Sequence, residues 1–180
     1  MPAAASHRVM LTCHADAPAA AVHGVEVGIR ALPQGMLALD YALEADLARV
    51  RILPSETAGR ADGLWQHTCF EAFIRSCDGR SYCELNFAAN RDWAAYRFDG
   101  YRAAMRPLPM AAPQLSVCRR EQRLELQVLV QLPEEFRSQG VRMALSAIVE
   151  EDDGRLSFWA LRHPPGKPDF HHAGAFALEL

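Results

Sequence analysis

The sequence predicts an all-β protein, an antiparallel β-sandwich of about ten strands with one or two short helices. Three observations lead to this fold class. Most apolar stretches alternate with polar residues at a period of two, as strands do. Turn signals separate these stretches, among them Asp153-Gly154, a strong hairpin signal. Helical periodicity is scarce. A closed barrel is the alternative architecture.

The expected elements follow one another with Gly-, Pro- and Asp-containing turns between them. We expect the Pro-rich stretch 107–113 to be a loop that crosses between the two halves of one domain. Two short segments, 44–50 and 133–139, are the best helix candidates. The predicted strands cover residues 25–30, 36–43, 68–75, 82–87, 93–98, 115–118, 124–131, 142–150, 156–161 and 176–180.

Length, composition and charge restrict the possible partners. The chain has 180 residues, 50% of them hydrophobic, and a formal charge of −3. This is typical of a single globular domain over residues 1–180. The near-neutral balance argues against nucleic acid as a partner. The apolar runs are far shorter than the ~20 residues of a membrane-spanning helix, so we expect no membrane partner. No residue pattern decides the oligomeric state.

The cysteines and the N-terminus indicate a reduced, cytoplasmic protein. Five cysteines occur without a C-x-x-C pair, which favours neither a zinc ribbon nor a redox pair. Residues 1–10 lack the basic and apolar regions of a secretory signal. Cys69 and Cys83 lie inside apolar strands, where we expect small buried side chains; a reactive thiol is the alternative. The five cysteines are Cys13, Cys69, Cys77, Cys83 and Cys118.

Polar side chains recur on one side of the central strands. Because successive strand residues point to opposite faces, Tyr82, Glu84 and Asn86 share a face, and Glu71 lies opposite Phe70. In the next strands Trp93 and Arg97 alternate with Tyr96 and Phe98, and Trp159 alternates with Phe158. If these strands are neighbours, the following side chains gather on one sheet surface: Glu71, Tyr82, Glu84, Asn86, Trp93, Arg97 and Trp159.

Such a surface has the chemistry to bind a polyhydroxylated ligand. Carboxylate and amide groups hydrogen-bond to vicinal hydroxyls, and an indole offers a flat apolar platform. The alternative is a solvated outer face, since antiparallel sheets normally carry polar residues outward. Large exposed aromatic side chains favour the binding face.

The segment 163–172 is rich in histidine and proline. His163, Asp169 and His171 are suitable metal ligands, although their spacing matches no metal motif. The alternative is that Asp169 caps a turn while a histidine hydrogen-bonds within a loop. His67 is a further candidate ligand. A haem would need an axial His or Met and an apolar slot.

Catalysis has little support in the sequence. Neither a G-x-S-x-G elbow nor a phosphate-binding glycine motif occurs. Glu71 and Glu84 could form the acid and base of a glycosidase, but carboxylates on adjacent strands are common for structural reasons. We therefore expect no enzyme activity.

An ordered set of segments resembles the bacterial DOMON-like proteins, a group related to carbohydrate-binding module family 9. The resemblance extends from about residue 11 to the C-terminus, nearly the whole chain. The residues that carry it are Arg60–Phe73, Tyr82–Phe87, Trp93–Phe98 with Tyr101-Arg102, Ser157–Leu161 and Pro168–His171.

The resemblance implies a β-sandwich whose relatives bind sugars or haem on one sheet. It implies aromatic platforms at Trp65, Trp93 and Trp159. It further implies hydroxyl-binding roles for Glu71, Glu84 and Asn86. This sequence departs from the family pattern in two ways. Sugar-binding relatives are usually secreted, whereas residues 1–10 show no secretory signal. The sequence Ala88-Ala-Asn90 also replaces the usual Pro-Ser after the strand 82–87.

The sequence thus leads to two function hypotheses from different classes. The first is a non-catalytic module that binds a small-molecule ligand, a saccharide or sugar-like compound, without a cofactor. The second is a haem or metal binder that uses its histidines. A structural protein with a merely solvated polar face is a third possibility.

Overall fold

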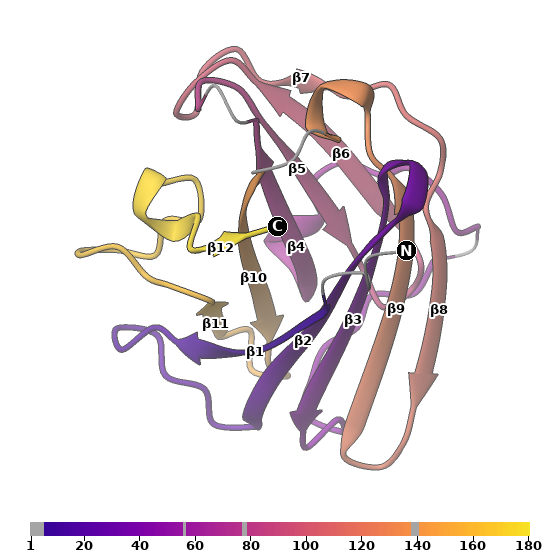
Figure 1. Cartoon of the computed structure of the whole chain (residues 1–180). Helices are drawn as coiled ribbons and strands as arrows, with labels where there is room; N and C mark the ends of the chain where they lie inside the picture. The colour runs from indigo at the N-terminus through magenta and orange to yellow at the C-terminus, as the bar shows by residue number, and fades with distance from the viewer. Residues whose placement is uncertain (1–5, 56, 77–78, 138–140) are drawn as a thin grey trace.

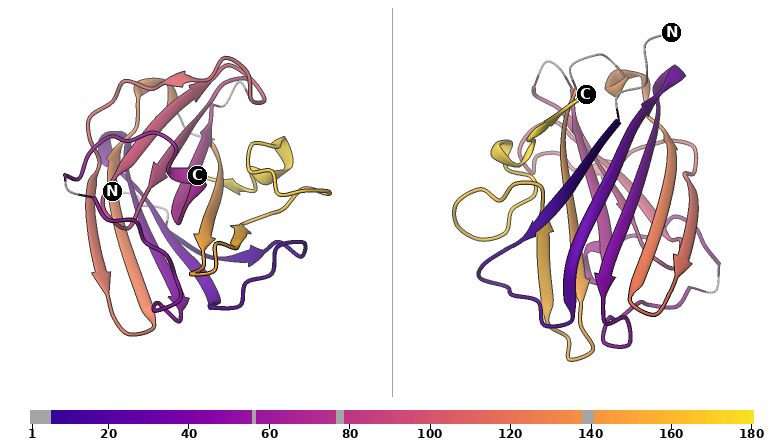
Figure 2. Two further views of the ribbon diagram at one scale, coloured as in Figure 1. Left: turned by 180° about the vertical axis from the view of Figure 1, so that it is seen from behind. Right: turned by 60° about the horizontal axis from the view of Figure 1, so that its bottom comes forward.

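The chain forms two antiparallel layers of strands packed face to face (Figures 1 and 2). The structure is a computed structural model that describes residues 6–55, 57–76, 79–137 and 141–180. Apart from short turns of 3₁₀ helix, the regular elements in these ranges are strands. The predicted all-β sandwich is confirmed.

The first layer, sheet A, holds five strands in the order β1-β2-β3-β9-β8. A long hairpin pairs β2 with β3, and β3 pairs with β9, a strand distant in the sequence, across nine positions. The strands are β1 (Ser6–Cys13), β2 (Val22–Leu32), β3 (Met36–Ala45), β8 (Gln114–Arg119) and β9 (Arg123–Gln131).

The second layer, sheet B, has the order β7-β6-β5-β4-β10-β11. A last short strand, β12 (Leu178–Glu179), pairs with β10. The end of β1 joins the two layers, because Thr12 and Cys13 pair with β11 while the rest of β1 pairs with β2. The other strands are β4 (Cys69–Arg75), β5 (Tyr82–Phe87), β6 (Trp93–Phe98), β7 (Arg106–Pro107), β10 (Arg142–Glu150) and β11 (Leu156–Ala160).

The helical elements of the described ranges are single 3₁₀ turns: η1 (Pro33–Gly35), η2 (Leu64–Gln66), η3 (Glu134–Phe136) and η4 (Ala173–Ala175). The helix predicted at 44–50 is wrong, because β3 continues to Ala45 and a turn follows at Asp46. The segment 133–139 contains only the turn η3, and residues 138–139 lie outside the described ranges. No helix in the described part of the chain has the length and apolarity to span a membrane.

Two of the connections predicted from the sequence are present in the structure. The predicted hairpin at Asp153-Gly154 is confirmed: Glu150 pairs with Leu156, and Gly154 adopts a φ of 84°. The Pro-rich stretch begins in β7 and then leads from sheet B to β8 of sheet A, as expected. Two strands, β1 and β7, were not predicted.

Sheet B is covered on both faces. Its inner face packs against sheet A through an apolar core that includes Phe70, Leu85 and Trp93. Its outer face carries a second apolar cluster, in which Tyr82 and Phe98 pack with side chains of the C-terminal segment. Figures 1 and 2 show that segment beside β10 and β11, on the side away from sheet A. The outer cluster consists of Phe73, Tyr82, Ala94, Tyr96, Phe98, Ala144, Ile148, Ala160, Phe170, Ala175 and Phe176.

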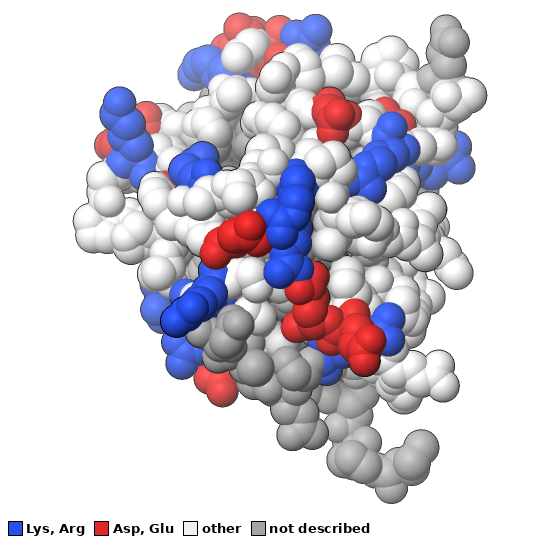
Figure 3. Space-filling view, turned by 90° about the horizontal axis from the view of Figure 1, so that it is seen from above, with Lys and Arg blue, Asp and Glu red and all other residues white. Residues whose placement is uncertain are grey.

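The described cysteines are free thiols, and the surface charges lie in mixed pairs. Cys69 and Cys83 are fully buried, as expected, and Cys13 and Cys118 are also free thiols. Cys77 lies outside the described residues. On the face drawn in Figure 3, basic and acidic side chains lie beside one another. Such exposed pairs contribute little to stability.

Candidate functional site

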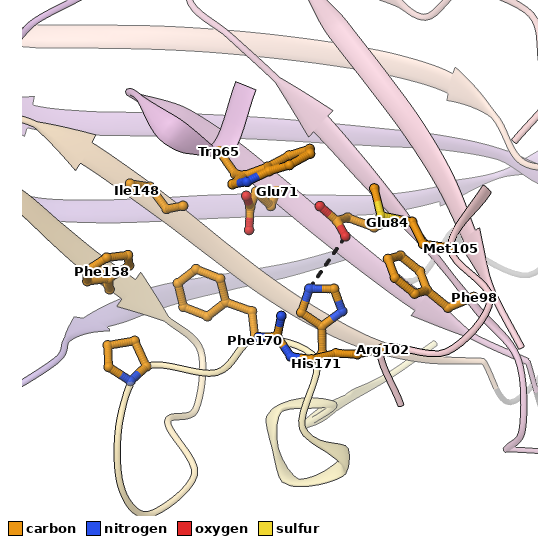
Figure 4. Close-up of a pocket in the computed structure, with 11 residues that line it drawn as sticks. Trp65, Glu71, Glu84, Phe98, Arg102, Met105, Ile148, Phe158, Phe170 and His171 are labelled. Atoms are coloured by element: carbon orange, nitrogen blue, oxygen red, sulfur yellow. Dashed lines mark ion pairs between the residues drawn. The ribbon is translucent and has the colours of Figure 1, made fainter. Parts of the chain in front are cut away.

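A cavity of about 360 Å³ lies on the outer face of sheet B, where the C-terminal segment and two loops approach the strands. It combines aromatic rings with two carboxyl groups, an imidazole and a guanidinium (Figure 4). Its lining residues are Trp65, Glu71, Glu84, Phe98, Arg102, Met105, Ile148, Phe158, Pro168, Phe170 and His171.

Two neighbouring strands place the carboxyls of Glu71 and Glu84 in this cavity. Glu71 pairs with Asn86 across β4 and β5, and Glu84 lies two residues from Asn86, so all three share a face. The Ser146 hydroxyl donates to Glu71 Oε2 at 3.0 Å, and the Asn86 amide donates to Glu84 Oε1 at 2.8 Å. Figure 4 shows both carboxyl groups pointing into the space below Trp65. These hydrogen bonds fix the orientation of each carboxyl.

Burial makes both carboxyls weak acids. Desolvation raises the pKa of Glu71 well above its ordinary value, and repulsion from Glu84 raises it further, against the Ser146 hydrogen bond. Desolvation raises the pKa of Glu84 to about 7, although the Asn86 hydrogen bond and the charge of Arg102 lower it. Near neutral pH the pair therefore retains at least part of one proton.

His171 forms the wall opposite Glu84. The backbone N–H of Arg102 donates to the Tyr82 hydroxyl at 3.2 Å, so that hydroxyl is free to give its own proton to His171 Nδ1, 2.8 Å away. The imidazole then carries its hydrogen on Nε2, which lies 3.6 Å from Glu84 Oε2. Burial lowers the pKa of His171 to about 4, so the ring is neutral at pH 7 and this contact is polar rather than ionic.

Arg102 and Asp169 tie the two loops that form the mouth of the cavity. The Arg102 guanidinium donates to Asp169 Oδ1 at 2.9 Å, and the Tyr101 hydroxyl donates to Asp169 Oδ2 at 2.6 Å. Asp169 Oδ1 also accepts the backbone N–H of His171 at 3.2 Å. Arg102 adopts a φ of 50°, in the left-handed region that non-glycine residues rarely enter. We call these three side chains, Tyr101, Arg102 and Asp169, the loop clasp.

Trp65 covers the carboxyls from a separate loop. The chain turns at Gly63, whose φ is 74°, and then forms the single turn η2 that carries the indole. The Tyr96 hydroxyl donates to Asp62 at 2.6 Å and anchors this loop to β6. The Trp65 and Tyr96 rings meet edge to face with centroids 5.7 Å apart. The indole is thus held as a fixed apolar platform.

The structure brings together most of the polar residues selected from the sequence. Trp65, Glu71 and Glu84 line the cavity. Tyr82 and Asn86 lie on the same sheet face, where they are buried and act on the lining side chains His171 and Glu84. Whether any of them contacts a ligand stays a prediction.

Trp93, Arg97 and Trp159 do not belong to this surface, so the expectation that they share it is wrong. Register pairs Cys83 with Arg97 and Phe87 with Trp93, which turns both side chains to the face opposite Glu84. Trp93 and Trp159 accordingly pack in the core between the layers. Arg97 lies on that same face of β6, where it forms an ion pair with Glu135. The expectation assumed that the polar half of every strand faces the same side, but the outer face of sheet B also carries many apolar side chains.

The cavity also contains residues that the sequence analysis did not select. Strand alternation could have indicated Phe98 and Phe158. Phe98 is next to Arg97 and Phe158 is next to Trp159, so each points to the face opposite its wrongly assigned neighbour. Arg102 occurs in a segment that carried the family resemblance. The residues added by the structure are Phe98, Arg102, Met105, Ile148, Phe158, Pro168 and Phe170.

The metal candidates have other partners. His163 Nε2 lies 2.7 Å from the Thr12 carbonyl and the ring packs against His14, whereas Asp169 belongs to the loop clasp. His67 lies 2.6 Å from Glu150. Among the described residues, no three His, Cys, Asp or Glu side chains form a group that could hold a metal ion.

The cavity does not have the ligands that a haem requires. Both nitrogens of His171 face protein groups, Tyr82 on one side and Glu84 on the other. Met105 is 48% exposed at the cavity rim. Two buried carboxyls face a space that would have to be an apolar slot. These donors do not fit a haem.

Structural comparison identifies the fold. No family model and no curated protein sequence matches the chain. The crystal structure of a putative carbohydrate-binding protein from Bacteroides uniformis superposes with a TM-score of 0.62 and 15% identity, over 96% of this chain and 84% of that one. A carbohydrate-binding module of family 9 from Caldicellulosiruptor kristjanssonii, in complex with cellotriose, superposes with a TM-score of 0.52 and 10% identity, over 88% and 75%. The fold is that of the family 9 carbohydrate-binding modules. At these identities the likeness concerns the fold alone.

Proposed function

We propose that the protein is a non-catalytic module that binds a small carbohydrate in the cavity on the outer face of sheet B. The observation that carries this proposal is the arrangement of a fixed indole, Trp65, above the inward-pointing carboxyls Glu71 and Glu84. The family 9 fold supports it, since one structural neighbour holds cellotriose. The DOMON-like relationship, which rests on the sequence segments, is part of the same proposal.

The geometry suits one sugar ring. An apolar ring face would stack on Trp65, while hydroxyls on the ring edge would hydrogen-bond to Glu71, Glu84 and the imidazole of His171. The loop clasp holds Arg102 at the mouth of the cavity before a ligand arrives, which lowers the entropy lost on binding. A site for a single ring should be weak, with a Kd of about 1 mM to 1 μM, or −4 to −8 kcal/mol.

Calorimetric titration with glucose, xylose and cellobiose tests this proposal. We expect saturable binding of at least one of them, accompanied by a change in tryptophan fluorescence. The Trp65→Phe variant should lose that fluorescence change and bind at least tenfold more weakly. Trp159→Phe is the matched control and should keep both, because Trp159 packs in the core between the layers. Cellobiose should remain intact after incubation, as expected of a binding module.

The proposal is rejected if no neutral or amino sugar binds to folded protein. It is also rejected if Trp159→Phe, rather than Trp65→Phe, abolishes the response. Release of glucose from cellobiose would replace the binding module with a glycosidase in which Glu71 and Glu84 act as acid and base.

A further inference from the structure

When Glu71 and Glu84 are both ionised, the cavity holds more negative charge than a neutral sugar requires, and a bound cation would favour that doubly ionised form. Glu71 and Glu84 are 2% and 5% exposed, and both line the cavity. Among the described residues, Glu71 accepts a side-chain hydrogen bond from Ser146, and Glu84 accepts one from Asn86. A hydroxyl group of a sugar adds another neutral hydrogen bond but does not relieve the repulsion between two carboxylates. A cation bound between the two carboxylates relieves that repulsion.

The basic side chain of the cavity wall is already paired. Arg102 donates to Asp169 at 2.9 Å, so its positive charge is paired within the loop clasp, although it still lowers the pKa of Glu84. The imidazole of His171 is neutral at pH 7 and lies 3.6 Å from Glu84. With both glutamates ionised, the described lining residues together with Asp169 carry three negative charges and one positive charge.

Other ionisable groups packed around the carboxyls do not supply the missing charge. Tyr82 and Tyr96, which lie on the same face, are phenols whose pKa burial raises, so both are neutral at pH 7. Tyr41 and Cys69 near Glu71 are also buried, with their pKa values raised by desolvation and by the Glu71 charge. Asp62 adds a carboxyl beside Tyr96.

The rings of the cavity complete a site suited to a cation. Trp65 lies over the two carboxyls, and Phe98, Phe158 and Phe170 form parts of the surrounding wall (Figure 4). The negative faces of aromatic rings attract an ammonium group, and desolvation strengthens that attraction. An ammonium group also offers three donors, enough for both carboxylates at once.

We propose that the cavity selects a sugar-sized ligand carrying a protonated amine, whose ammonium group binds between Glu71 and Glu84. This inference rests on the proposed carbohydrate-binding function and names the ligand class of the same site. The ring of the ligand would lie against Trp65, and its amine would supply a positive charge between the two carboxyls, where none of the described residues forms an ion pair with both.

Calorimetry at pH 7 with matched sugars tests the selection. The probes are glucose, N-acetylglucosamine, glucosamine and 6-amino-6-deoxyglucose, which share one ring and differ in the presence, position or acylation of the amine. We expect at least one amino sugar to bind tenfold or more tightly than glucose and N-acetylglucosamine.

Charge-neutral variants identify the groups responsible. Glu71→Gln and Glu84→Gln keep the size of each side chain and a hydrogen-bond acceptor, and each should reduce the amine preference to less than threefold. Glu135→Gln is the matched control, because Glu135 pairs with Arg97 on the opposite face and should leave the preference unchanged. Circular dichroism and urea unfolding show that each variant is folded.

The outcomes separate this inference from the proposed function. If glucose binds as tightly as both amino sugars, carbohydrate binding stands and the amine selection is wrong. If an amine preference persists in both glutamine variants, the ammonium site is not between these residues and the inference is wrong. If none of the sugars binds, both proposals fall.

Discussion

The protonation of Glu84, a residue that lines the cavity, makes the stability of the whole protein depend on pH. Its carboxyl has a pKa of about 7 in the folded protein against an ordinary value of 4.5. Between these two pH values the folded protein holds a proton that the unfolded chain has lost. Stability contributed by that proton is therefore complete below pH 4.5 and is lost as the pH rises to 7. Glu71 acts in the same direction, because burial raises its pKa as well.

We predict that Glu84→Gln stabilises the protein in a pH-dependent way. The free energy of unfolding of the variant relative to the original chain should increase by up to about 3 kcal/mol between pH 4.5 and pH 8, since the amide has no proton to lose. Urea unfolding at a series of pH values measures the difference. Glu121→Gln, at an exposed position, is the control and should give parallel curves. Equal pH profiles for Glu84→Gln and the original chain would show that the Glu84 carboxyl is not desolvated.

Single residues also show how far strand parity leads. Alternation correctly placed Glu71, Glu84 and Asn86 on one face, because each strand was recognised with nearly correct bounds. The same rule divided β6 correctly into Trp93 and Arg97 against Tyr96 and Phe98, but it could not say which half faces Glu84. Only the register, which pairs Glu84 with Tyr96, decides that.

Among the elements, the hairpin between β10 and β11 is specified by its turn residues. Gly154 has a φ of 84°, and the position that a Cβ atom would occupy is open. We predict that Gly154→Ala costs about 1 kcal/mol through backbone strain alone. Gly154→Asn should cost less, because asparagine enters the left-handed region more readily. Thermal unfolding of both variants measures the costs, and an equal or larger loss for asparagine would contradict this explanation.

The elements that were missed or misjudged have local physical causes. At 44–50 the spacing of apolar residues favours a helix, but Asp46 ends the strand by accepting the backbone N–H of Ala48 at 3.2 Å. Such a side-chain turn competes with helix formation. In the strand β1 the exposed Met10 stands between Val9 and Leu11, so three successive apolar residues hide the alternation of buried and exposed positions. Its pairing with both β2 and β11 depends on the tertiary structure.

Across the whole molecule, the C-terminal segment turns one exposed sheet face into a partly closed site. Phe170 and His171 come from this segment, whereas Glu71 and Glu84 come from strands about a hundred residues earlier. The sequence contains no local signal for this covering, because alternation shows which side chains share a face of a strand but not that a distant segment buries this face as well. The cavity therefore could not be predicted, although several of its residues could.

One hydrogen bond connects the core between the layers to the strand that bears Glu71. Tyr41, on β3 of sheet A, is 1% exposed, and its hydroxyl donates to the backbone carbonyl of Glu71 at 2.9 Å. The side chain of Glu71 lies on the opposite face of β4, where Ser146 holds it. The bond thus contributes to the attachment of the layers without forming part of the cavity.

We predict that Tyr41→Phe lowers the free energy of unfolding by about 1 kcal/mol, because it removes one buried hydrogen bond. It should leave sugar affinity within twofold of the original value. Tyr96→Phe is the matched comparison: its lost hydroxyl anchors Asp62 and with it the loop of Trp65, so affinity should fall severalfold. Urea unfolding and calorimetry on the two variants measure both quantities. Weakened binding in Tyr41→Phe, with Tyr96→Phe unaffected, would show that sugar recognition depends on the attachment of the layers rather than on the position of the indole.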